Sequence, residues 1–163
     1  GMEWTRALGL FEELPSRGLP RTALGYAAAM MAWERSGHRA QAVSLFREMR
    51  WDNVRANASN YNCAIDAYST DACWAEALTL VQEMDARWLH CDAITFGSAI
   101  AACENAARWQ EALSLLWDGA ARGVAGNTSY NSAISACGKG SQWELASAVF
   151  EEMAPAQIAP DAV

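Results

Sequence analysis

The chain has 163 residues and a net charge of −7, from 19 acidic and 12 basic residues. Its hydrophobic content of 52% is enough for a folded core, but no apolar run reaches the roughly 18 residues of a membrane helix. The negative charge argues against strong nonspecific binding to nucleic acid. We expect no membrane association, and the chain shows no secretory or transit segment.

The residue types that most often carry catalysis or bind metals are scattered along the chain. It has five cysteines and two histidines, without CxxC or zinc-ligand spacing. We interpret the cysteines as small core residues in a reducing compartment. No phosphate-binding loop or nucleophile motif is present. The sequence therefore predicts no enzyme activity, no metal site and no cofactor.

An aromatic residue recurs along the whole chain at separations of 35, 35 and 34 residues, at Tyr26, Tyr61, Phe96 and Tyr130. Such a period indicates a helical repeat array. We divide the chain into 1–22, the second half of a preceding repeat, then 23–57, 58–92, 93–126, 127–161, and 162–163, the start of a further repeat. Repeat 3, residues 93–126, is one residue short.

Each repeat carries two patterns of apolar residues at helical spacing. The first helices are predicted at 23–36, 58–70, 93–106 and 127–139. Tryptophan recurs near the start of the second helix, at Trp4, Trp74, Trp109 and Trp143. The second helices are predicted to end near Gly18, Asn53, Trp88 and Gly123, and strand signals are nearly absent. The fold class is therefore all-α, a solenoid of helix–turn–helix hairpins that bury a shared core by stacking.

The repeat sequences resemble the pentatricopeptide repeat, an RNA-binding family. The first helices open with YNCAI, FGSAI and YNSAI, and the second helices include WAEALTLVQEM and WQEALSLLWDG. The resemblance covers essentially the whole chain. It implies a right-handed superhelix whose first helices line a groove for single-stranded RNA, with about one base read per repeat.

The resemblance also implies roles for residues at equivalent places in the four repeats. The base-reading pairs are Ala27 with Asn57, Asn62 with Asp92, Gly97 with Gly126, and Asn131 with Asp161. The residues expected to sandwich the bases are Leu24, Ser59, Ile94 and Thr128. Arg35 and Lys139 match places that face phosphates. Asn–Asp pairs in this family favour uracil, so uracil is expected at repeats 2 and 4, whereas Ala27 and Gly97 offer a base no hydrogen bond.

Each of these assigned roles has a structural alternative. Asn62 and Asn131 suit the first turn of a helix, and Asp92 and Asp161 suit the N-cap of the following helix.

The function is predicted as RNA binding within a longer organellar protein, in chloroplast or mitochondrion, that processes or stabilises RNA. The alternative is a protein-interaction scaffold with a degenerate code. The apolar faces at both ends also predict end-to-end self-association.

Overall fold

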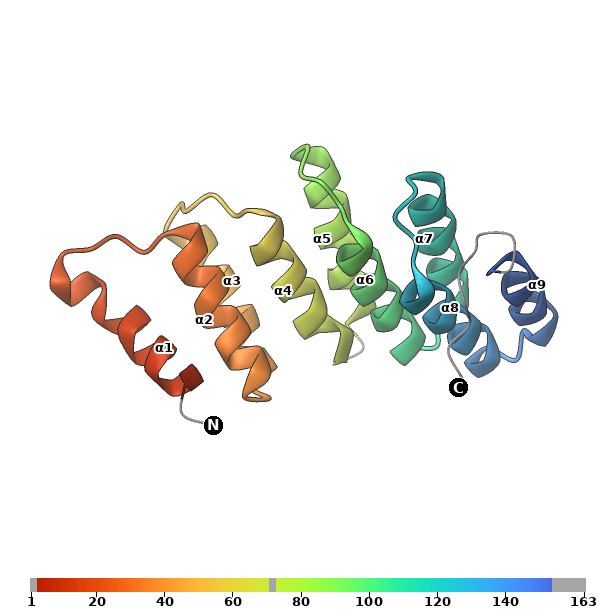
Figure 1. Ribbon diagram of the computed structural model, residues 1–163, viewed down its shortest axis with the longest axis horizontal. Coiled ribbons are helices and arrows are strands. Elements are labelled where there is room, and N and C mark those ends of the chain that lie inside the picture. The colour runs from red at the N-terminus through yellow and green to blue at the C-terminus, as the bar shows by residue number, and fades with distance from the viewer. Residues whose placement is uncertain (1–2, 71–72, 154–163) are drawn as a thin grey trace.

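The computed structural model describes residues 3–70 and 73–153, and this part of the chain is helical (Figure 1). A short helix, α1, spans Glu3–Glu13, and a 3₁₀ turn follows at Pro15–Arg17. The first helices of the four repeats are α2 (Ala23–Arg35), α4 (Ala58–Thr70), α6 (Ala93–Asn105) and α8 (Asn127–Lys139). The second helices are α3 (Arg39–Trp51), α5 (Trp74–Ala86), α7 (Trp109–Ala121) and α9 (Trp143–Met153).

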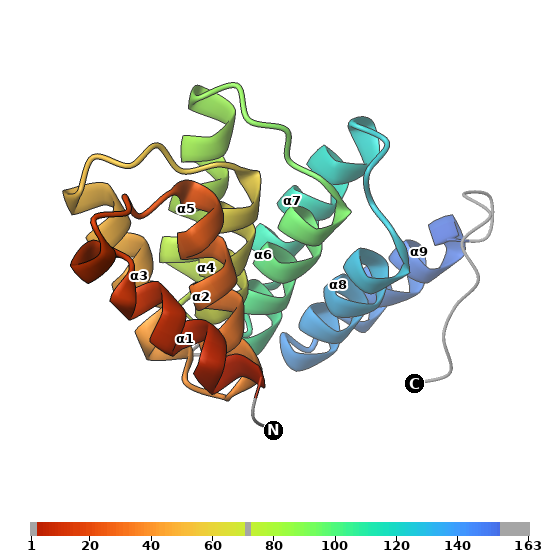
Figure 2. The same cartoon turned by 60° about the vertical axis from the view of Figure 1, so that its left-hand side comes forward.

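The hairpins stand side by side in chain order (Figures 1 and 2). Each first helix packs against its own second helix and against the first helix of the next hairpin. Each second helix from α3 to α7 also packs against the next first helix. Second helices do not pack closely on one another in the described residues, but side chains link them, as in the Arg50–Glu83 ion pair between α3 and α5 at 3.0 Å. The first helices therefore form a continuous inner layer, and the second helices form a more widely spaced outer layer.

The recurring aromatic residues lie in the core between hairpins. The side chains of Tyr26, Tyr61 and Phe96 are completely buried, and Tyr130 is 5% exposed. The Tyr61 ring meets the Phe46 ring of the preceding hairpin edge to face, with centroids 5.2 Å apart. An edge-to-face pair adds to the free energy gained by burying both rings. The period of the sequence is therefore the period of the interfaces between hairpins.

Left-handed residues follow the second helices at equivalent places. Gly18 and Gly123 have φ of 71°, and Asn53 and Trp88 have φ of 55° and 56°. This backbone conformation ends a helix and suits glycine or asparagine best. These are the four residues near which the sequence predicted the second helices to end. Trp88 is unusual there because its large side chain is 95% exposed.

Candidate nucleic-acid interface

The candidate interface lies along the N-terminal turns of the inner helices. The expected sandwich residues occupy the second position of these helices, and all four are exposed. Leu24 is 75% exposed and Ile94 is 63% exposed, although each lies two residues from a buried aromatic ring. Since water makes such exposure unfavourable for an aliphatic side chain, these positions are suited to contact with a flat, apolar ligand surface.

Repeat 2 carries the most complete polar cluster at this interface. The Asn62 amide nitrogen, Nδ2, donates a hydrogen bond to Asp92 Oδ1 at 3.2 Å. Asp92 precedes α6 and forms a capping box with Thr95: Thr95 N donates to Asp92 Oδ1 at 2.9 Å, and Asp92 N donates to Thr95 Oγ1 at 3.1 Å. Thr95 Oγ1 donates in turn to Asn62 Oδ1 at 2.7 Å. Asp92 is therefore both the helix cap and the partner of Asn62.

These contacts set the charge of the cluster. Burial opposes ionisation of Asp92, but hydrogen bonds from the Thr95 backbone and from the Asn62 amide outweigh it and lower the Asp92 pKa. The carboxylate is therefore ionised at neutral pH and holds the Asn62 amide by a charge-assisted hydrogen bond.

Repeat 1 has a different arrangement because its first expected reading position is Ala27, which is 1% exposed. Asn57 and Asn60 cap α4 reciprocally: Asn57 N donates to Asn60 Oδ1 at 3.0 Å, and Asn60 N donates to Asn57 Oδ1 at 3.1 Å. Asn60 Nδ2 also donates to the Ala23 carbonyl at 2.9 Å. The amide groups here form hydrogen bonds with backbone atoms, and the side chain of Ala27 presents no polar group to a ligand.

Repeat 3 has an open pocket where a side chain is missing. Ile94, Gly97 and Thr128 line a pocket of about 350 Å³, together with Ser98 on α6 and Asp66 on α4. An added Cβ at Gly97 would meet only Thr128 Cγ2, at 3.9 Å, which is an ordinary contact. Gly126 precedes α8 without a side-chain cap. The pocket therefore has a mixed lining, in which Ile94 and Ala101 are apolar and Ser98 and Asp66 are polar, and neither expected reading position carries a side chain.

In repeat 4, Asn131 is half-buried and has a polar or electrostatic partner. Its expected companion, Asp161, lies outside the described residues.

The expected phosphate-facing residues have unequal surroundings. Lys139 Nζ forms an ion pair with Glu104 Oε1 on α6 at 3.0 Å, and Ser135 donates to the same oxygen at 2.7 Å. Burial opposes ionisation of Glu104, but the hydrogen bonds from Ser135 and Lys139 outweigh it and lower its pKa. Arg35 is exposed at the end of α2. The charge of Lys139 is thus largely balanced within the protein.

Acidic side chains lie between the inner helices, which the sequence pattern did not indicate. Glu34 on α2 shares a hydrogen bond with Asp66 on α4, and Ser98 on α6 donates to Asp66 Oδ1 at 3.0 Å. Thr95 was also missed, although its place three residues after Asp92 is a capping-box signal that can be read from the sequence.

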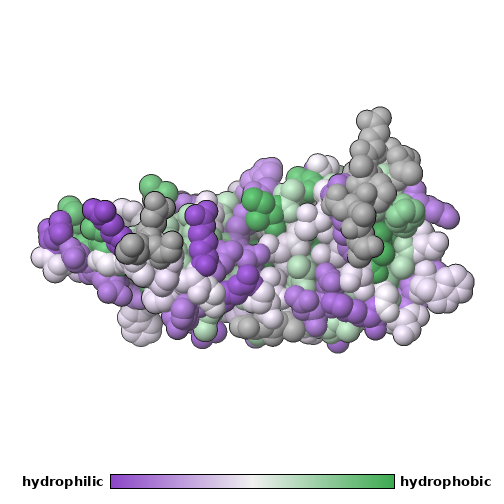
Figure 3. All heavy atoms as spheres, turned by 60° about the horizontal axis from the view of Figure 1, so that its bottom comes forward, coloured by the Kyte–Doolittle hydropathy of each residue, from purple (hydrophilic) through white to green (hydrophobic). Residues whose placement is uncertain are grey.

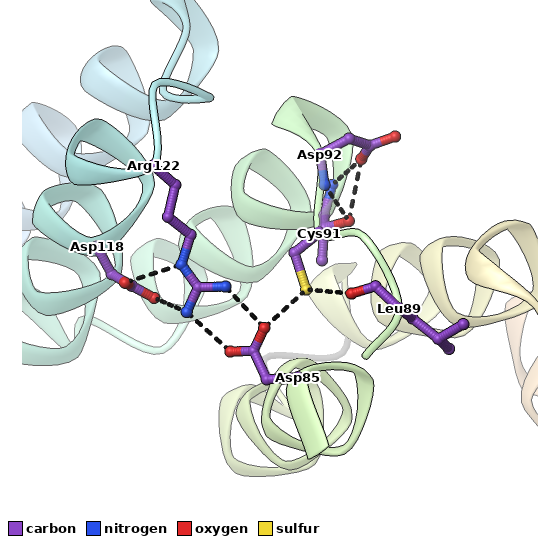
Figure 4. Close-up of polar contacts among 7 residues, drawn as sticks. Asp85, Leu89, Cys91, Asp92, Asp118 and Arg122 are labelled. Atoms are coloured by element: carbon purple, nitrogen blue, oxygen red, sulfur yellow. Dashed lines mark hydrogen bonds and ion pairs between the residues drawn. The ribbon is translucent and has the colours of Figure 1, made fainter. Parts of the chain in front are cut away.

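A second polar group binds the outer layer together (Figure 4). The Arg122 guanidinium at the end of α7 reaches Asp85 of α5 at 2.7 and 2.8 Å and Asp118 at 2.8 Å. The hydrogen bond to Arg122 lowers the Asp85 pKa. The same guanidinium lies 5.4 Å from the centre of the Phe96 ring. The contact joins repeats 2 and 3 behind the core aromatic residue, on the side of the second helices.

No group of three or more metal-binding side chains occurs within 3–70 and 73–153. Cys63 and Cys103 are buried, and burial raises the pKa of their thiols to about 11 and about 12, so both are protonated at neutral pH. No helix in the described part of the chain is long and apolar enough to cross a bilayer.

Stacked helical hairpins with a repeated core residue and an inner layer of polar side chains define an α-solenoid repeat protein. The family model for the PPR repeat matches residues 59–89 and 128–154. Curated protein sequences gave no match.

Solved structures of the pentatricopeptide repeat protein PPR10 are similar to this chain. The structure of PPR10 in complex with an 18-nucleotide psaJ RNA element superposes with a TM-score of 0.80 at 28% identity, over 98% of this chain. The structure of PPR10 from maize gives a TM-score of 0.67 at 23% identity. This chain spans only 24% and 23% of those two chains. Two stretches of this chain thus match the PPR repeat, and its stacked hairpins have the fold of a pentatricopeptide repeat protein, as the repeats predicted.

Proposed function

We propose that this chain binds single-stranded RNA along its inner helices, with about one base per repeat and uracil at repeats 2 and 4. The observation that carries the proposal is the Asn62–Asp92 cluster. It lies beside exposed sandwich positions, and the Asn62 amide has hydrogen-bonding groups that the cluster does not use. An asparagine amide has two N–H donors and a carbonyl with two lone pairs. Asn62 uses one donor on Asp92 and one lone pair on Thr95, which leaves a donor and an acceptor for a base edge.

The similarity to PPR10 with bound RNA supports the same proposal. By resemblance to the family, the chain acts in chloroplasts or mitochondria, within a longer protein that processes or stabilises transcripts, and has no catalytic activity of its own. A stacked base contributes roughly 1–3 kcal/mol. After the cost of association, three or four bases correspond to a dissociation constant on the order of tens of micromolar.

The proposal is tested by fluorescence anisotropy with short RNAs that carry either uracil or adenine at the positions facing repeats 2 and 4. We expect the uracil RNA to bind about tenfold more tightly, and binding to weaken with salt because phosphates are also contacted. Asn62→Thr is expected to move the preference at repeat 2 from uracil to guanine, since a Thr–Asp pair in this family favours guanine. Gln41→Thr on α3, in the outer layer, is the matched control.

The second candidate function is a protein-interaction scaffold. Two observations favour it: the reading positions Ala27 and Gly97 carry no polar group, and the carboxylates of Glu34, Asp66 and Glu104 lie among the inner helices. On one face of the molecule, hydrophobic residues form separate small patches among hydrophilic ones (Figure 3). Absence of RNA binding at high protein concentration, or equal binding of both RNAs, favours the scaffold.

A further inference from the structure

The hydroxyl of Thr95 lies at the centre of the polar cluster in repeat 2, although Thr95 belongs to the next helix. It is completely buried, and its oxygen lies 2.7 Å from Asn62 Oδ1, 3.1 Å from the backbone nitrogen of Asp92 and 3.0 Å from Asp92 Oδ1. A threonine hydroxyl has one proton to donate. The shortest contact assigns that proton to Asn62.

With that assignment, four of the five contacts in the cluster pair a donor with an acceptor, and the 3.0 Å contact between the hydroxyl and Asp92 Oδ1 has no proton between its oxygens. Asp92 N donates to the Thr95 hydroxyl, and the hydroxyl donates to Asn62 Oδ1. Asn62 Nδ2 and Thr95 N both donate to Asp92 Oδ1. If the amide were reversed, its NH₂ group would face the hydroxyl and its oxygen would face the carboxylate. The amide oxygen would then face the charged Asp92 carboxylate without a proton between them. The bond from Nδ2 to Asp92 and the 2.7 Å bond from the Thr95 hydroxyl to Oδ1 therefore both favour the observed orientation.

The orientation of an amide matters for reading a pyrimidine. Uracil carries a carbonyl at position 4 and an N–H at position 3, whereas cytosine carries an amino group at position 4 and a bare nitrogen at position 3. In a pose where the N–H end of the amide faces position 4 and its oxygen faces position 3, uracil forms two hydrogen bonds and cytosine forms none. A reversed amide in the same pose would prefer cytosine.

We propose that Thr95 is a positioning residue that fixes the Asn62 amide and thereby makes repeat 2 select uracil over cytosine. The inference rests on the proposed RNA-binding function and adds a third residue, contributed by the following repeat, to the reading pair.

The other described junctions lack this arrangement. The residue equivalent to Thr95 at the start of α4 is Asn60. Its side-chain amide accepts a hydrogen bond from Asn57 N and donates one to the Ala23 carbonyl. At the start of α8 it is Ser129, which is buried but faces a junction where Gly97 and Gly126 have no side chains. Ser129 therefore provides a matched control, a buried hydroxyl at the same repeat position with no reading amide to orient.

The experiment compares RNAs that differ only by uracil or cytosine at the position facing repeat 2, and measures both dissociation constants by anisotropy. Thr95→Val keeps the shape and removes the hydroxyl, Thr95→Ser restores the hydroxyl, and Ser129→Ala is the control. Each variant is also melted in a circular dichroism spectrometer. Because the loss of one hydrogen bond changes an equilibrium by about three- to tenfold, we expect Thr95→Val to lower the uracil-to-cytosine ratio by about that factor. Thr95→Ser and Ser129→Ala should keep the wild-type ratio.

An unchanged ratio in folded Thr95→Val would overturn the inference, even if its melting temperature falls, since the lost helix cap alone explains a lower stability. Equal loss of selectivity in Ser129→Ala would also overturn it. If the wild-type chain binds RNA with no preference for uracil at this position, the proposed readout fails and the inference fails with it. If Thr95→Val does not fold, Thr95→Cys gives the same comparison, because a thiol is only a weak donor.

Discussion

Among single residues, Glu34 has the most perturbed carboxyl group in the described part of the inner layer. It is half-buried on α2, beside Asp66 on α4. Burial, together with the hydrogen bond and charge shared with Asp66, raises the pKa of Glu34 to about 7, against attraction from Arg35 and Arg39 that lowers it. Ser98 on α6 donates to Asp66 Oδ1, and the group of this pair whose pKa is raised is Glu34.

This shift predicts how stability depends on pH. The folded chain binds a proton at Glu34 more tightly than the unfolded chain does, so the stabilisation is complete below the ordinary value of 4.5 and is lost as the pH rises towards 7. We expect the melting temperature to fall between pH 5 and pH 8. Glu34→Gln should remove much of this fall, because glutamine stays neutral throughout.

The matched control is Glu144→Gln, at an exposed position on α9, which should leave the pH dependence unchanged. A melting temperature that rises from pH 5 to pH 8, or equal slopes in the wild type and Glu34→Gln, would contradict the prediction.

Between elements, the tryptophan that begins a second helix packs against the following hairpin. A methyl group built at Gly140, at the end of α8, would lie 2.3 Å from Trp109 Cδ1. Trp74 meets the next hairpin through Arg108, whose guanidinium lies 4.3 Å from the ring centre. The structure thus places these two tryptophans, which recur near the start of the second helix, between neighbouring hairpins.

Two glycines at the end of α8 therefore predict opposite effects of the same substitution. Gly140→Ala forces the large Trp109 ring to move, and we expect a loss of about 1–3 kcal/mol in unfolding free energy. Gly138→Ala lies within α8 with nothing inside 4 Å, and we expect a gain of up to about 1 kcal/mol from helix propensity. Urea denaturation followed by circular dichroism measures both, and a stable Gly140→Ala would show that Trp109 is not a fixed wedge.

For the whole molecule, stability depends on hairpins that cover one another. Phe46, Val81 and Leu116 occupy equivalent places in the first three repeats and are 3%, 4% and 0% exposed. Phe150 occupies that place on α9 and is 53% exposed. The end-to-end association predicted from the sequence would use such a face, and it stays a prediction.

The position in the array should decide the cost of the same substitution. Phe46→Ala removes a ring packed against Tyr61 and is expected to cost about 3–5 kcal/mol of unfolding free energy. Phe150→Ala removes a half-exposed ring and is expected to cost less than about 1 kcal/mol. Equilibrium urea titrations of both variants, followed by circular dichroism, provide the comparison. Similar losses would mean that the α9 face is covered in solution, and sedimentation velocity would then show whether a second copy covers it.

The sequence by itself determined the fold and the period of the core. An aromatic residue every 34 or 35 positions and two apolar stripes per repeat predict stacked hairpins, because helical periodicity and the need to bury each stripe are local properties. It also predicted the reading positions, whose roles stay predictions. The capping alternative for Asp92 and its pairing with Asn62 proved compatible, since one carboxylate oxygen accepts hydrogen bonds from both.

The tertiary structure alone decided which side chains meet across hairpins. Thr95 and Asn62 are 33 residues apart in the chain, and Glu34 and Asp66 belong to different repeats. Arg35 and Lys139 look equivalent in the sequence, but of the two only Lys139 forms an ion pair with another described residue, Glu104 on the preceding inner helix. Such contacts depend on how far neighbouring helices are rotated and shifted when they pack, and this is set by the shapes of all the buried side chains together.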